Sequence, residues 1–154
     1  MKRIIIAAIT LLTAVMSCEK TNTPKKETLQ DKLCKEWSLT DGTVDIKIYV
    51  SFMADGSFGL YQRLGTSTFT HYSGTWTLSG NILSGKYSDG TDWGASYEVL
   101  FYDKLMELTS QTAIPESRTY EQKPIPEEVK GSTAKVRSQS SSGILNSQPQ
   151  YRWL

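Results

Sequence analysis

Strict alternation of apolar and polar residues between Val44 and Phe52 constrains the fold of this chain more than any other feature. Every second residue of this stretch is apolar, from Val44 through Ile48 to Phe52. A period of two places these side chains on one face of an extended strand. The alternation ends at Asp55-Gly56, a pair that suits a tight hairpin, and resumes with the apolar residues that follow. The segment therefore predicts two antiparallel strands joined by a short turn.

Further strand-like segments are separated by turn sequences rich in Gly, Asp and Ser. They are residues 35–40, 68–78, 82–87, 93–101, 105–109 and 117–123. Only the stretch after Thr28 is typical of a helix, a short one that begins with a capping sequence completed by Asp31. Short strands in succession close into a barrel or stack as a sandwich, and consecutive hairpins favour up-and-down closure. The sequence predicts an all-β fold, an antiparallel up-and-down barrel of about eight strands with a short N-terminal helix.

The first 17 residues have the pattern of an export signal. Two basic residues precede an apolar run that is too short to span a membrane and that ends at the small residue Ser17. The sequence Val15-Met16-Ser17-Cys18 is similar to the lipobox of bacterial lipoproteins. That resemblance implies that Cys18 is acylated and becomes the first residue of the mature protein. An ordinary cleaved signal followed by a chance cysteine is the alternative.

Composition divides the remaining chain into three parts. Residues 18–27 are polar and form a tether, and residues 28–123 form the barrel. Residues 124–154 begin with prolines that end the sheet and continue with few apolar residues, which predicts an extended or disordered tail. The exception is 151–154, Tyr-Arg-Trp-Leu, which we expect to dock onto the barrel because burying its aromatic rings removes a large apolar area from water.

Residues that could carry chemistry are few. The single histidine, His71, falls on the outward register of its strand, and Cys34 is expected to be a small buried hydrophobe. No pair of His or Cys residues has metal-ligand spacing, and phosphate-loop and dinucleotide-binding patterns are absent. Basic and acidic residues are nearly balanced, 17 against 16, so charge gives no argument for nucleic acid. We expect no catalytic residue, metal or cofactor; a calcium site among turn aspartates is the weaker alternative.

Aromatic residues dominate the predicted inward face of the barrel. A barrel of eight strands has just enough interior for packed side chains or for one small ligand. If it is hollow, the predicted ligand-binding residues are Phe58, Tyr72, Trp76, Tyr97 and Phe101. If it is solid, the same residues are plain core.

Three short motifs resemble those of the small lipocalin-like lipoproteins of Gram-negative gut bacteria. They are Leu33-Cys34-Lys35-Glu36-Trp37, Phe52 followed by Ala54-Asp55-Gly56, and Gly74-Thr75-Trp76. The resemblance covers roughly residues 33–123 and implies ligand binding inside the barrel. It also implies that Trp37 packs beneath an arginine of the last strand, for which Arg118 is the candidate. Lys35 stands where the family pattern has glycine.

The expected protein is an envelope lipoprotein, lipid-anchored at Cys18 and located at the outer membrane, on either of its faces. Its barrel is expected to bind a small, largely apolar ligand without catalysis. The alternative is a structural or partner-binding lipoprotein with a solid barrel core. It would engage another envelope protein through its tail or through outward residues, namely Tyr49, Tyr61, Arg63 and Phe69.

Overall fold

The computed structural model describes residues 26–65, 68–131, 134–135 and 151–154. Its elements are α1 (Leu29–Leu33), β1 (Glu36–Leu39), β2 (Ile46–Phe52), β3 (Ser57–Leu64), β4 (Thr70–Ser79), β5 (Ile82–Tyr87), β6 (Tyr97–Tyr102), β7 (Leu105–Ser110), β8 (Ser117–Gln122), α2 (Glu127–Gly131) and β9 (Ala134–Lys135). Within these ranges no helix has the length and apolar character needed to cross a membrane. The predicted signal, residues 1–17, and the anchor residue Cys18 lie outside the described residues.

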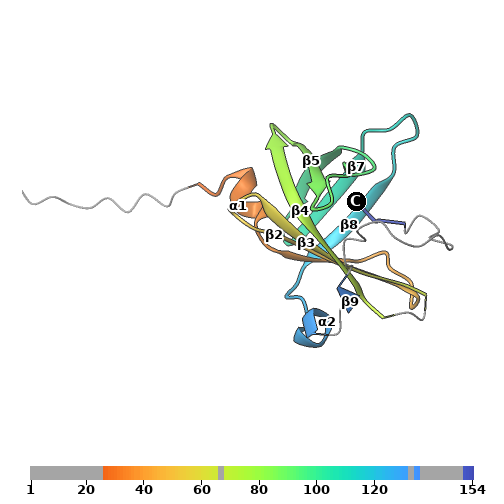
Figure 1. Cartoon of the computed structure of the whole chain (residues 1–154). Helices are drawn as coiled ribbons and strands as arrows, with labels where there is room; N and C mark the ends of the chain where they lie inside the picture. The colour runs from red at the N-terminus through yellow and green to blue at the C-terminus, as the bar shows by residue number, and fades with distance from the viewer. Residues whose placement is uncertain (1–25, 66–67, 132–133, 136–150) are drawn as a thin grey trace, which may run out of the picture.

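Strands β1 to β8 close into a barrel, which confirms the predicted all-β, up-and-down fold (Figure 1). Each strand pairs antiparallel with the next one along the chain, from the β1–β2 pair to the β7–β8 pair. Closure comes from β1, because Trp37 lies opposite Val50 of β2 on one side and opposite Gln122 of β8 on the other. A strand paired on both sides leaves few exposed edge groups.

The alternation in β2 fixes which face is inside. Ile48, Val50 and Phe52 are buried, Tyr49 and Ser51 between them are half-buried, and Lys47 on the same outer face is exposed. The strand is shorter than predicted, because the Ile46 amide donates to the Thr43 carbonyl at 3.1 Å and so closes a turn. Val44 consequently lies outside the strand and is 85% exposed.

Helix α1 covers the end of the barrel where β1 begins. Its capping box is complete, since the Thr28 hydroxyl accepts from the Asp31 amide and the Asp31 carboxylate accepts from the Thr28 amide. Leu33 of α1 is fully buried in the core. The Trp37 Nε1 group donates to the Leu33 carbonyl at 3.0 Å, which ties the helix to β1. This end of the barrel is therefore closed by local sequence.

The described part of the tail is more ordered than the sequence predicted. Residues 127–131 form the helix α2, so the prediction of an extended or disordered tail is wrong for these residues, whereas 134–135 are extended and pair in parallel with β4 as β9. Ile125, just before α2, and Val129, within it, pack against Phe69 on the outside of the barrel. The Ile125 amide donates to the Glu36 carboxylate at 2.7 Å. A few apolar residues at the right spacing were enough to order this segment.

Candidate functional site

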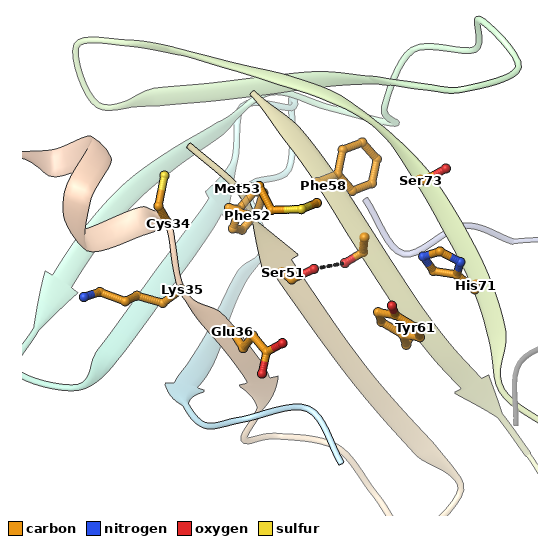
Figure 2. Close-up of a pocket in the computed structure, with 11 residues that line it drawn as sticks. Cys34, Lys35, Glu36, Ser51, Phe52, Met53, Phe58, Tyr61, His71 and Ser73 are labelled. Carbon is orange, nitrogen blue, oxygen red and sulfur yellow. Dashed lines mark hydrogen bonds between the residues drawn. The ribbon is translucent and has the colours of Figure 1, made fainter. Parts of the chain in front are cut away.

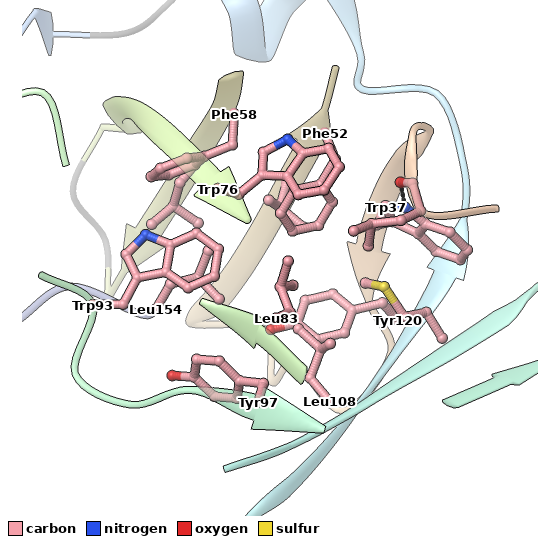
Figure 3. Close-up of a cluster of buried hydrophobic side chains, with 14 of the residues drawn as sticks. Trp37, Phe52, Phe58, Trp76, Leu83, Trp93, Tyr97, Leu108, Tyr120 and Leu154 are labelled. Atoms are coloured by element: carbon pink, nitrogen blue, oxygen red, sulfur yellow. Dashed lines mark hydrogen bonds between the residues drawn. The ribbon is translucent and has the colours of Figure 1, made fainter. Parts of the chain in front are cut away.

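The aromatic residues predicted to bind a ligand form a packed wall inside the barrel. The ring of Phe58 lies 5.0 Å from Trp93 and 5.7 Å from Tyr87, centroid to centroid. Tyr72 also packs against Tyr87, and Tyr97 packs against Trp93. Figure 3 shows the rings of Phe58, Trp93 and Tyr97 together with Leu154. The structure thus brings Phe58, Tyr72 and Tyr97 together through Tyr87 and Trp93.

The other two predicted ligand-binding residues face the end covered by α1. Trp76 meets Phe52 edge to face at 6.0 Å, and its Nε1 group donates to the Ser57 carbonyl at 2.8 Å. Phe101 is half-buried and packs against Trp37 at 5.7 Å. Trp76 and Phe101 therefore pack beside the aromatic wall, toward the end covered by α1.

Arg118 does not lie over Trp37, so the predicted cation–π pair between them is wrong. On β8 the residue opposite Trp37 is Gln122, and Arg118 is four residues further along, about 13 Å away at the usual strand rise. Its guanidinium instead lies 4.3 Å from the ring centre of Trp153. Arg118 therefore belongs to the end of the barrel opposite α1.

We call this opposite end the barrel mouth, and it is occupied by residues 151–154. The residues that define the mouth by contacting this segment are Gln62, Tyr72, Tyr87, Asp89, Arg118 and Tyr120. Docking of the segment onto the barrel was predicted and is confirmed. Leu154 is only 3% exposed and belongs to the core cluster, so the segment closes the barrel interior.

Gln62 and Tyr87 hold the main chain of the segment. The Gln62 side-chain amide donates to the Tyr151 carbonyl at 2.6 Å, and its carbonyl accepts from the Trp153 amide at 3.1 Å. The Tyr87 hydroxyl donates to the Leu154 main-chain oxygen at 2.7 Å. Because burial raises the pKa of Tyr87 well above its usual value, this hydroxyl keeps its proton and acts as a donor.

Charged and aromatic groups hold the side chains of the segment. The Arg118 guanidinium covers the Trp153 ring and also donates to the Trp153 carbonyl at 3.2 Å. On the other side, the Trp153 Nε1 group donates to the Tyr120 hydroxyl at 3.0 Å. Arg152 forms an ion pair with Asp89, and its guanidinium lies 4.5 Å from the ring centre of Tyr87. Each of these contacts requires a particular side-chain chemistry.

The Arg152–Asp89 pair predicts that acid weakens the docking of the segment. The hydrogen bond from Arg152, followed by those from Thr91, lowers the pKa of Asp89. Because the pKa of Asp89 is lower in the docked state, its ionised carboxylate stabilises docking fully at pH values above the ordinary aspartate pKa of about 3.9. This stabilisation is lost as the pH falls below that value. We expect the fluorescence of Trp153 to report undocking in that range. Asp89→Asn should dock less tightly at pH 7 and lose this part of the acid dependence; an unchanged acid midpoint would contradict the assignment.

The sequence contains one indication of the mouth, which is a polar residue at an inward strand position. Gln62 occupies an inward position of β3, a strand whose other inward residues are apolar, and Arg118 occupies an inward position of β8. Gln62 is 5% exposed, which is unusual for a polar residue unless it is hydrogen-bonded. A polar residue at a strand position where apolar residues are expected therefore indicated a binding position. The alternation pattern alone did not identify the residues that Gln62 binds.

A groove of about 450 Å³ with a mixed polar and apolar lining lies on the outside of the barrel, near the end of α1 (Figure 2). Its lining includes Cys34, Ser51, Tyr61 and His71. His71 stacks on Tyr61 with ring centres 4.4 Å apart, and burial lowers its pKa, so it is neutral at pH 7. Burial also raises the pKa of Cys34, which keeps it a thiol.

The outward aromatic residues proposed for partner binding are covered by the chain itself. Phe69 is 8% exposed and packs beneath α2, with Tyr49 and Tyr61 partly buried beside it. The Arg63 guanidinium lies 5.2 Å from the Phe69 ring centre. These residues form a small second core.

Across the described ranges, no group of three or more His, Cys, Asp and Glu side chains is placed as metal ligands would be. Comparison of the chain with protein-family models and with curated protein sequences gives no match.

Proposed function

We propose that this chain is an envelope lipoprotein, anchored through Cys18, whose barrel binds a small, largely apolar molecule without covalent chemistry. The export signal and lipobox-like sequence of residues 1–18 support the anchor. The likeness of the barrel motifs to lipocalin-like lipoproteins and the closed eight-strand barrel support a binding role for the interior. Outer-membrane location follows from the same resemblance.

The main support for the proposal is that the mouth is filled by the 151–154 segment and not by residues of the strands. The apolar wall of Phe58, Tyr87 and Trp93 is completed by Leu154, a residue that belongs to no strand of the barrel. At the mouth, the strands therefore enclose a space that is filled by Leu154 of the 151–154 segment. Withdrawal of the segment would uncover an apolar surface bordered by Gln62 and Arg118, which is the composition of a small-molecule site.

Trp93 supplies a second argument. Its Nε1 group is buried and has no hydrogen-bond partner among the described residues. The indole lies flat on Gly85, where a Cβ atom would come within 2.3 Å of the ring. An unpaired buried donor costs about 1–3 kcal/mol, and a ligand with an acceptor group at this position would recover that energy. We therefore expect an apolar ligand with at least one hydrogen-bond acceptor.

Ligand titration of two full-length chains tests the proposal. Tryptophan fluorescence of the wild type should shift in a saturable manner with long-chain fatty acids, retinoids or bile-acid-like amphiphiles. Trp153→Ala removes the ring that lies under the Arg118 guanidinium and the N–H that donates to Tyr120, and it should bind the same ligand about tenfold more tightly, because the segment then competes less strongly.

Leu100→Ala provides the matched control, because Leu100 faces outward on β6 and is 39% exposed. It should bind as the wild type does. Absence of saturable binding in both the wild type and Trp153→Ala would contradict ligand binding. That result would leave the alternative of a solid barrel that acts by binding a partner.

A further inference from the structure

We infer that the barrel mouth is a peptide-binding site and that residues 151–154 are its resident ligand rather than a fixed part of the fold. The ligand class is an extended peptide with an arginine, a tryptophan and an aliphatic residue in succession. The inference does not rest on the proposed function, because such a peptide can bind whether or not the interior accepts a small molecule.

Recognition of the main chain is the first element of such a site. Gln62 accepts from the amide of residue 153 and donates to the carbonyl of residue 151. A single side-chain amide thus pairs with two peptide groups of an extended segment, as the main chain of a neighbouring strand would. Tyr87 adds a donor for the main-chain oxygen of residue 154. These contacts specify an extended backbone but no sequence.

Recognition of the side chains is the second element. Residue 153 has to offer an aromatic face to Arg118 and an N–H to Tyr120, which is the chemistry of tryptophan. Residue 152 has to be a cation, because it lies between the Asp89 carboxylate and the faces of Tyr72 and Tyr87. Residue 154 has to be apolar, because it is buried in the core cluster.

The way in which residues 151–154 are attached to the barrel allows another peptide to replace them in the mouth. Residues 151–154 pair with no strand of the sheet, and residues 136–150 separate them from β9. The segment is therefore held by the mouth contacts and by its covalent link. Without an occupant, the buried side chain of Gln62 and the hydroxyl of Tyr87 would lose these partners, which favours replacement by another peptide over an empty mouth.

Binding of a free peptide tests the inference. The probe is a labelled synthetic peptide with the sequence of residues 148–154, titrated into the full chain carrying Trp153→Ala and followed by fluorescence anisotropy. We expect saturable binding. The wild-type chain should bind the peptide at least about tenfold more weakly, because its own segment competes at an effective concentration on the order of millimolar.

Sequence dependence separates this site from non-specific adhesion. The peptide with Trp153→Ala should bind at least about tenfold more weakly, since it lacks the ring that packs under Arg118 and the N–H that donates to Tyr120. The chain with Asp89→Lys should lose affinity for the natural peptide and regain it for the peptide with Arg152→Glu. Equal binding of all these peptides would overturn the inference.

Circular dichroism shows whether the chain with Trp153→Ala folds. If it does not fold, a second form of the chain provides the test. A protease recognition sequence inserted between residues 136 and 150 of the wild type allows the segment to be cut from an otherwise unchanged barrel. The cut segment should remain bound during gel filtration and exchange with the labelled peptide. A chain that, once cut, neither retains the segment nor takes up the peptide would refute the inference.

Discussion

Gly74→Ala is expected to lower the free energy of unfolding by about 3 kcal/mol or more. A Cβ atom at Gly74 would lie 2.0 Å from the Lys86 carbonyl oxygen and 2.8 Å from both Phe58 and the Cα atom of Tyr87. Two of these neighbours are main-chain atoms of β5, so no rotamer change relieves the overlap, and the β4–β5 pair has to separate. Urea denaturation measures the effect, which is a large part of the 5–15 kcal/mol that is usual for a domain.

Gly94→Ala is the matched control for this prediction. Gly94 has nothing within 4 Å of an added Cβ and no left-handed φ angle. Its substitution should leave the free energy of unfolding unchanged within about 0.5 kcal/mol. A Gly74→Ala variant with the urea midpoint of the wild type would show that β4 and β5 are further apart than described.

Cys18→Ala is expected to abolish membrane association of the chain expressed in a Gram-negative host. Each buried CH₂ of an acyl chain contributes about 0.8 kcal/mol, and stable anchoring takes two lipid chains or one chain with a further signal. The proposed anchor is the lipid at Cys18, the residue that ends the lipobox-like sequence. The wild type should incorporate radiolabelled palmitate and sediment with the membrane fraction, whereas the variant should do neither.

Cys34→Ala separates a lipid effect from a general cysteine effect. Cys34 is partly buried beside the core and does not belong to the lipobox-like sequence. This variant should retain both the label and the membrane fraction. Labelling of Cys18→Ala, or labelling lost only in Cys34→Ala, would contradict the proposed anchor.

The strands could be predicted because their determinants are local. Alternation over Ile46–Phe52 and the Asp55-Gly56 turn depend on neighbours in sequence, and Gly56 has the left-handed φ of 82° that the turn requires. Gly74 lies where two strands approach closely, as the contacts described above show. Two strand predictions began too early along the chain: β2 begins at Ile46 rather than at Val44, and β6 begins at Tyr97 rather than at residue 93.

Where residues 125–129 and 151–154 pack on the barrel could not be predicted, because their positions depend on contacts between residues far apart in sequence. The outward side of Phe69 is covered by Ile125 and Val129, although nothing in their own segment indicates where they pack. Arg118 was assigned to Trp37 by resemblance, yet the register of β8 places it at the opposite end.

By itself, the sequence determined an all-β chain of short antiparallel strands with an aromatic interior, since a period of two and turn residues act over a few positions. Only the tertiary structure decided what occupies that interior at the mouth. Gln62 and Trp153 are 91 positions apart and meet because closure of the sheet leaves one end open to the 151–154 segment. Their hydrogen bonds form only after the barrel exists, so no local pattern could specify them.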